Sequence, residues 1–278
     1  MNGNMPVQGT NYSGESSSAA PALSGKRIVV TRAPHQAAEM ADLLRSYGAE
    51  PLFYPCLEII PPEDPGPLDE ALGAAAAGRF DWLVVTSANT AWALAQRLAI
   101  LDLSLGNLRA AAIGPQTAEA VRESLHLEVE VVAGKHVAEA LADTLQPVAG
   151  ARLFLPQSAI ARPVLAQLLR EAGAEVMAVD AYQTTLGKGG DDVPHLLAEG
   201  KVDALTFTSS STVRNFLTRL EREGGHRGDL LNICLAAIGP ITAKTMAEMA
   251  LPLAVVPETY TLAGLIAALN TYFAEKES

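Results

Sequence analysis

Two stretches of the sequence decide the fold. Residues 27–50 read RIVVTRAPHQAAEMADLLRSYGAE and residues 152–175 read RLFLPQSAIARPVLAQLLREAGAE, with 8 identities in 24 positions. Each begins with an apolar run, continues with apolar residues at helical spacing and reaches a glycine, Gly48 or Gly173. This order predicts a strand followed by a helix that ends at a C′ glycine.

Two further matches follow in the same order along the chain. Residues 81–98 align with 203–220 with 7 identities in 18 positions, and residues 111–120 align with 236–245 with 7 in 10. The offsets of the three matches are 125, 122 and 125 residues. Ordered matches at nearly one offset predict an internal duplication of a unit of about 120 residues.

Short apolar runs alternate with helical patterns in both units. Runs of this length predict parallel strands that are covered on both faces. The fold class is therefore α/β, with four or five strands in each unit, which is the size of a flavodoxin-like domain. The predicted strands are residues 27–32, 81–86, 109–113, 128–132, 152–156, 203–208, 232–238 and 253–256.

Two extended segments, residues 49–59 and 174–185, occupy matching positions in the repeats. If the chain crosses between two lobes at both places, these segments could pair as a ladder between the lobes. The alternative is two domains in tandem with one linker near residues 147–150, which leaves the length of both segments unexplained. The residues themselves favour the crossover only slightly.

Composition excludes several classes of protein. The chain has 278 residues and a net charge of -11, which argues against a nucleic-acid binder held by phosphate neutralisation. No apolar stretch is long enough to span a membrane, and the Ser- and Gly-rich start predicts a disordered tail instead of a signal peptide. Cys56 and Cys234 lie far apart and are expected to be buried thiols in a cytoplasmic protein.

Hydroxyl and glycine residues follow the second and third strands of each unit. In parallel sheets ligands bind beyond the carboxyl ends of the strands, and helix N-termini there offer N–H donors to carboxylates or phosphates. Each turn taken alone is more simply a helix cap, but the same two turns in both repeats favour a ligand cleft. The candidate residues are Thr86, Ser87, Ala88, Asn89, Gly114, Thr117, Thr208, Ser209, Ser210, Ser211, Gly239 and Thr242.

The remaining polar residues exclude more chemistry than they suggest. No phosphate-binding loop, nucleophile elbow or paired metal-ligand histidines occur in the sequence. Arg32, Arg162 and Lys244 could add charge near the cleft, although solvated positions fit them equally well. Tyr182 lies on the second extended segment and offers a phenol that carries its proton at neutral pH, or is simply a packed linker aromatic.

The repeated turns, the motif AAIGPITA at residues 236–243 and the sequence from Tyr182 to Thr184 together resemble the uroporphyrinogen-III synthase family, over residues 23–275. The resemblance implies two flavodoxin-like domains joined by a two-stranded antiparallel ladder. One domain would hold residues 23–52 and 183–278 and the other residues 56–178, with linker strands 53–55 and 179–182 and a disordered tail over residues 1–22.

The resemblance also implies the reaction, in which hydroxymethylbilane is dehydrated and cyclised to uroporphyrinogen III with inversion of ring D. Tyr182 matches the tyrosine that is thought to assist loss of the hydroxyl, and the repeated turns would hold the carboxylate arms. Ile241 departs from the pattern, because several relatives carry a hydroxyl there. No metal or organic cofactor is implied, and a cytoplasmic monomer that receives its substrate from hydroxymethylbilane synthase is expected.

Two other functions fit the residues alone. A two-lobed binding or sensor protein for a small polyanion needs the same cleft without chemistry. A sugar-phosphate enzyme with an α/β fold is disfavoured because no carboxylate pair stands out for acid–base work.

Overall fold

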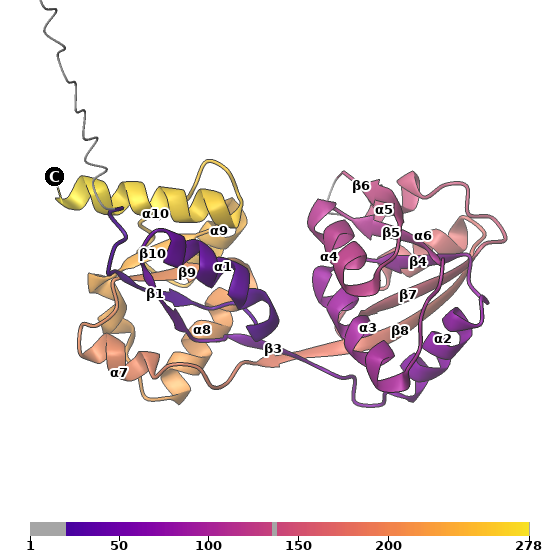
Figure 1. Ribbon diagram of the computed structural model, residues 1–278, viewed down its shortest axis with the longest axis horizontal. Helices are drawn as coiled ribbons and strands as arrows, with labels where there is room; N and C mark the ends of the chain where they lie inside the picture. The colour runs from indigo at the N-terminus through magenta and orange to yellow at the C-terminus, as the bar shows by residue number, and fades with distance from the viewer. Residues whose placement is uncertain (1–20, 135–137, 278) are drawn as a thin grey trace, which may run out of the picture.

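The structure is a computed structural model that describes residues 21–134 and 138–277. Figure 1 shows two α/β domains that stand apart and are joined by two extended segments. Most of the predicted tail, residues 1–20, lies outside the described residues. Ala22, at its end, packs against the core of the first domain.

The sheet of the first domain, called domain 1, consists of four parallel strands in the order β10-β9-β1-β2. Read from β2, this is the order 2-1-3-4 of a flavodoxin-like sheet. The run at residues 253–256 was expected to add a fifth strand, but only Val255 forms a bridge, to Ala236 of β10. Pro252 and Pro257 flank this run and cannot donate a backbone hydrogen bond. The strands are β10 (Cys234–Ala237), β9 (Ala204–Phe207), β1 (Arg27–Val30) and β2 (Glu50–Phe53).

Helices cover both faces of this sheet, as near-continuous apolar strands require. One face packs on α1 (Pro34–Ser46) and α10 (Leu262–Glu277), and the other on α7 (Val193–Ala198), α8 (Ser210–Arg222) and α9 (Pro240–Glu248). The 3-10 helix η1 (Arg227–Asn232) precedes β10. As predicted, α1 ends before Gly48, which has a φ of +75°.

Domain 2 contains the larger sheet, in the order β3-β8-β7-β4-β5-β6. The last five strands are parallel, and β3 runs antiparallel to β8. One face packs mainly on α2, α3 and α4 and the other on α5 and α6. The strands are β3 (Leu57–Ile60), β8 (Glu175–Leu186), β7 (Arg152–Ser158), β4 (Trp82–Val85), β5 (Arg109–Ile113) and β6 (Val129–Ala133), and the helices are α2 (Gly66–Ala76), α3 (Ala88–Leu101), α4 (Pro115–Leu125), α5 (Ala138–Thr144) and α6 (Val164–Glu171).

The two sheets have the same strand order once the repeat-related strands are matched. β10, β9, β1 and β2 of domain 1 correspond to β5, β4, β7 and β8 of domain 2. In domain 1, β1 and β2 come from the first repeat and β9 and β10 from the second. In domain 2, β7 and β8 come from the second repeat and the other strands from the first. The chain crosses between the lobes twice, which excludes the tandem arrangement, whereas the internal duplication stays a prediction.

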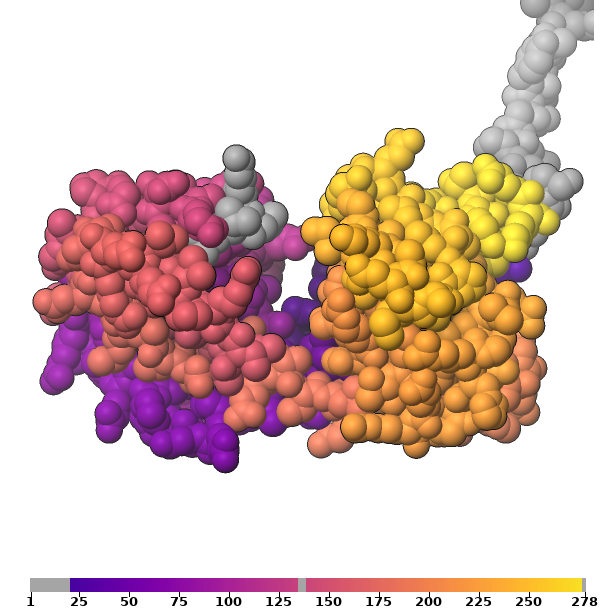
Figure 2. All heavy atoms as spheres, turned by 180° about the vertical axis from the view of Figure 1, so that it is seen from behind, coloured from indigo at the N-terminus to yellow at the C-terminus, as the bar shows by residue number. Residues whose placement is uncertain are grey.

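The ladder between the lobes pairs Leu57–Ile60 with Gln183–Leu186. It begins two residues after the expected linker strand 53–55 and one residue after the expected linker strand 179–182, because β8 stays paired with β7 as far as Tyr182. The α/β class with two parallel sheets and an antiparallel ladder is confirmed, whereas the domain limits stay a prediction. Figure 2 shows the lobes as separate bodies with a hollow between them above the connecting strands.

The connecting segments cross closely beside domain 1. A side chain at Gly187 would collide with the carbonyl oxygen of Pro55, so only glycine fits at this crossing. Arg219 of α8, 4% exposed, stacks on the ring of Tyr54 at 3.7 Å. Its guanidinium donates to the carbonyl oxygens of Pro55 (2.8 Å) and Gly189 (2.7 Å). One buried side chain thus fastens both connections to domain 1.

Candidate functional site

The predicted turns all lie where a strand passes into a helix. Ser87 is the N-cap of α3 and Ser209 is the N-cap of α8. Gly114 occupies the same position before α4, with a φ of +80°, and Gly239 precedes α9 in an extended conformation. The four turns therefore place free helix N–H groups at the carboxyl edges of the two sheets, as the sequence predicts.

Tyr182 meets the first of these turns. Its phenol oxygen lies 3.2 Å from the Ser87 hydroxyl, and the Tyr182 side chain is 6% exposed. The Ser87 hydroxyl also accepts a hydrogen bond from the backbone N–H of Thr90 (3.1 Å). Two residues that the sequence singled out separately, 95 positions apart, thus form one hydrogen-bonded pair.

The same turn also contacts the other lobe. The side-chain oxygen of Asn89 accepts a hydrogen bond from Gln36 Nε2 (2.8 Å) and lies 3.1 Å from His35 Nε2. The His35 ring stacks on Trp92 with 4.3 Å between centroids. Because His35 and Gln36 follow β1 and Asn89 follows β4, these contacts bring the carboxyl edges of the two sheets together.

Burial holds the pKa of His35 below its ordinary value. The hydrogen bond to Asn89 opposes this shift, and the positive charge of Arg32 adds to it. The neutral imidazole is therefore favoured at the contact between the lobes. A neutral ring that donates from Nε2 to Asn89 keeps the contact free of buried charge.

The repeat-related turn of domain 1 is closed on itself. Ser209 and Thr212 form a reciprocal capping box, and Ser211 Oγ lies 3.0 Å from Ser209 Oγ. The Ser210 hydroxyl lies 2.7 Å from that of Thr245 in α9. Thr208 is half-buried at the start of the turn. All the recorded side-chain bonds of this turn stay within domain 1.

The other predicted site residues offer mainly backbone groups. Thr117 and Thr242 are 7% and 4% exposed, so their side chains pack inward. Ala88 and Gly114 have no polar side chain, and Gly239 lies against the ring of Tyr260, which is 58% exposed. A ligand at these positions would meet N–H groups at helix starts instead of hydroxyls. Ile241, which departs from the pattern of the resemblance, is 79% exposed to solvent.

The three cations expected near the cleft differ in environment. Arg162 and Lys244 are exposed, as solvated charges would be. The Arg32 side chain is only 18% exposed.

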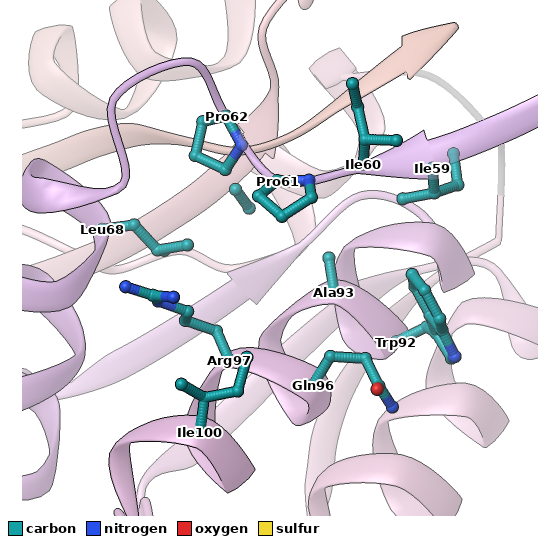
Figure 3. Close-up of a pocket in the computed structure, with 11 residues that line it drawn as sticks. Ile59, Ile60, Pro61, Pro62, Leu68, Trp92, Ala93, Gln96, Arg97 and Ile100 are labelled. Carbon is teal, nitrogen blue, oxygen red and sulfur yellow. The ribbon is translucent and has the colours of Figure 1, made fainter. Parts of the chain in front are cut away.

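A cavity of about 250 Å³ lies beside the ladder in domain 2 (Figure 3). Apolar side chains of β3, α2 and α3 line most of it, and Arg97 at its edge is paired with Asp69 (2.5 Å). Two of its lining residues adjoin the predicted site, because Trp92 stacks on His35 and Ala181 is the neighbour of Tyr182. Its mainly apolar lining does not suit a polyanion.

His35, Gln36 and Trp92 were not predicted as site residues. Their place in the sequence could have identified two of them, because His35 and Gln36 follow a strand at the carboxyl edge of its sheet, where ligands bind. In the described ranges, 21–134 and 138–277, no group of three or more His, Cys, Asp or Glu residues is arranged to hold a metal ion. No helix within these ranges is long and apolar enough to cross a membrane.

Comparison with known proteins gives a consistent result. A family model described as "Uroporphyrinogen-III synthase HemD" matches residues 38–267. A uroporphyrinogen-III synthase from Synechococcus elongatus is 35% identical over 257 residues, covering 90% of this chain and 96% of the relative. A putative uroporphyrinogen-III synthase from Methanothermobacter thermautotrophicus is 33% identical over 261 residues, covering 89% and 99%.

Solved structures share the fold. A mutant uroporphyrinogen III synthase from Thermus thermophilus superposes with a TM-score of 0.57 at 21% identity, covering 90% of this chain and all of the other. The synthetase from Helicobacter pylori gives a TM-score of 0.55 at 18% identity, covering 89% and 99%. From the family model and the identity to its relatives, the chain belongs to the uroporphyrinogen-III synthase family.

Proposed function

We propose that the chain converts hydroxymethylbilane into uroporphyrinogen III, by loss of water and ring closure with inversion of ring D. The enzyme is then a lyase of tetrapyrrole biosynthesis. The observation that carries this proposal is the Tyr182–Ser87 pair, a phenol held at 3.2 Å from a helix-cap hydroxyl. This pair supports the proposal because a phenol can donate a proton, and the turn beside it contacts the other lobe.

Loss of the hydroxyl needs little from the protein. The lone pair of the terminal pyrrole nitrogen expels the hydroxymethyl oxygen, and Tyr182 donates the proton that lets this oxygen leave as water. The azafulvenium ion that remains gives up its N–H proton, which restores the phenol. Ser87 orients the Tyr182 hydroxyl, so it is a positioning residue in this scheme.

Ring closure is chiefly a positioning task. The azafulvene carbon must bond to the substituted carbon of the last ring, through a spiro intermediate, and not to the free position. Holding the two ends of the linear substrate at attacking distance provides most of the rate gain for such a step. Two lobes that meet at Asn89 and are joined by a ladder are suited to folding the substrate into this shape.

The carboxylate arms would be held by short-range donors. The turns at residues 86–89, 114–117, 208–211 and 239–242 offer helix N-termini whose dipoles favour negative charge. A chain with a net charge of -11 cannot attract an octacarboxylate by its overall field, so these local groups must supply the affinity.

The reaction as written uses no metal and no organic cofactor. We propose that the protein acts as a monomer in the cytoplasm and takes hydroxymethylbilane directly from the synthase that makes it. Because free hydroxymethylbilane closes spontaneously to isomer I, a short path between the two enzymes would limit the formation of that isomer.

Supplying freshly made hydroxymethylbilane, oxidising the products and separating the porphyrin isomers tests the function. Isomer III should predominate with the protein and isomer I without it. If isomer I alone accumulates in both reactions, the synthase function fails. A polyanion-binding protein without chemistry would then explain the cleft.

A further inference from the structure

Arg32 is a partly buried cation whose side chain has no hydrogen bond among the described residues. It follows β1 at the carboxyl edge of the domain 1 sheet, three residues before His35. Its side chain is 18% exposed, and its Nε atom is buried with no partner. Among the described residues none forms a hydrogen bond with this side chain, and the nearest carboxylate oxygen, on Glu39, is 3.9 Å away.

Several other arginines have side-chain hydrogen bonds, although the Nε atom of Arg27 is also buried without one and lies 3.5 Å from a Glu50 carboxylate oxygen. Arg97 pairs with Asp69, Arg109 with Glu130 and Arg152 with Asp81, each through two side-chain hydrogen bonds. Arg219, which is more deeply buried than Arg32, donates to two carbonyl oxygens and to Glu223. The buried Nε of Arg32 lacks such a partner, which is costly, and protein stability alone does not account for keeping it.

The repeat-related strand of domain 2 carries a second unsatisfied group. Ser158 is the last residue of β7, and its hydroxyl is buried without a hydrogen bond. β1 and β7 match in the repeat, and each is the first strand at the switch point of its sheet, where ligands bind in such folds. The two lobes thus each present an unpartnered polar side chain at the same topological position.

We propose that Arg32 is the charged anchor for one carboxylate arm of the substrate, and that Ser158 donates a hydrogen bond to the substrate from the opposite lobe. This inference rests on the proposed function and names side chains for a site otherwise built from backbone N–H groups. A guanidinium matches a carboxylate through two parallel hydrogen bonds, which fixes direction as well as charge. The contact of His35 with Asn89 holds the Arg32 loop against domain 2.

Burial and charge around Arg32 support this role. Burial holds the pKa of Arg32 below its ordinary value, and the charge of Glu39 opposes that shift only in part. The guanidinium stays protonated at neutral pH in either case, because arginine ordinarily loses its proton only far above this range. Glu39 is 70% exposed and can turn away when a substrate carboxylate arrives.

Steady-state kinetics with hydroxymethylbilane and binding of uroporphyrin III test the anchor. Arg32→Gln should raise KM and the Kd for uroporphyrin III by about tenfold or more, with kcat changed by less than about threefold, because an anchor binds substrate and transition state alike. Arg32→Lys, which keeps the charge but not the fork, should recover part of the loss. Arg45→Gln removes the same charge from the exposed end of α1 and should change neither constant.

Two further variants keep the test decisive if Arg32→Gln folds poorly. Glu39→Gln removes the carboxylate that lies 3.9 Å from Arg32 and should lower KM about twofold to fourfold. Ser158→Ala should raise KM about threefold to tenfold without loss of thermal stability, because the hydroxyl has no partner to lose.

The outcomes separate this inference from the function. If the wild-type chain makes isomer III while Arg32→Gln, Glu39→Gln and Ser158→Ala all keep its KM and Kd, the anchor fails and the synthase function stands. If the wild-type chain makes isomer I alone, the function itself fails.

Discussion

The turns at residues 86–89 and 208–211 share a sequence pattern and a helix-cap geometry, yet their contacts differ. Ser87 bonds to Tyr182 on the connecting strand, and Asn89 bonds to the other lobe. Ser209 and Ser211 bond only within their own turn. Similar sequences in the two turns therefore give the same local structure, a helix cap, while their long-range contacts differ. The first turn joins the lobes to the proposed proton donor, and the second holds its own domain together.

Removing the proton donor should have the largest effect. Tyr182→Phe keeps the ring in the core of domain 2 and deletes only the hydroxyl. We expect kcat to fall by about 100-fold, the lower end for loss of a general acid, with KM changed by less than about threefold. Single-turnover kinetics with hydroxymethylbilane measure this step. A kcat equal to that of the wild type would remove Tyr182 from the mechanism.

The serine caps test whether the two turns differ in role. Ser87→Ala and Ser209→Ala each remove a cap and should lower the free energy of unfolding by about 1 kcal/mol. Only Ser87→Ala also frees the Tyr182 hydroxyl, so its kcat should fall about tenfold and that of Ser209→Ala much less. Urea unfolding and steady-state kinetics give the two quantities. Equal losses of kcat would mean that the turns play the same part.

The contact between the lobes can be broken at one side chain. Asn89→Ala removes both acceptor contacts to α1 and should let the lobes separate, which raises the radius of gyration measured by X-ray scattering. We expect KM to rise about threefold. The matched control is Ser211→Ala at the repeat-related position, whose radius of gyration should not change. An unchanged radius in Asn89→Ala would show that the ladder alone sets the separation.

The smallest effect concerns pH. Because burial holds the pKa of His35 below its ordinary value of about 6.5, the unfolded chain binds a proton at a higher pH than the folded chain does. The His35 contribution to stability is therefore complete above about pH 6.5 and is lost as pH falls through the folded-state pKa. Thermal unfolding between about pH 7.5 and 5 should show a shallower decline for His35→Gln than for the wild type, whereas His226→Gln, an exposed site, should follow the wild type. Parallel curves for His35→Gln and the wild type would contradict this.

Sequence predicts what is local or repeated in this molecule. Apolar runs gave the parallel strands, and Gly48 and Gly173 gave helix ends with positive φ. Ser87 and Ser209 could be placed at helix starts because caps follow strands in a fixed order. The strand expected at residues 253–256 does not form at the sheet edge, because the flanking prolines have no backbone N–H to donate.

Contacts between distant segments could not be predicted in the same way. Three features depend on how the two lobes meet. The Arg32 Nε has no hydrogen bond, His35 stacks on Trp92, and Arg219 donates hydrogen bonds to both connecting segments. No single stretch of sequence records that geometry. The pairing of Tyr182 with Ser87 is intermediate, since both were predicted as site residues but their hydrogen bond follows from the pairing of β8 beside β7.

One hydroxymethylbilane reaction, run in parallel for the wild type and Tyr182→Phe, tests most directly whether the chain is a synthase whose chemistry lies at Tyr182. Porphyrin isomers are separated after oxidation. We expect isomer III from the wild type at a rate well above that of spontaneous closure, and an increase in isomer I with Tyr182→Phe, because spontaneous closure then competes. Isomer I alone from the wild type, or equal rates of isomer III from both proteins, would contradict it.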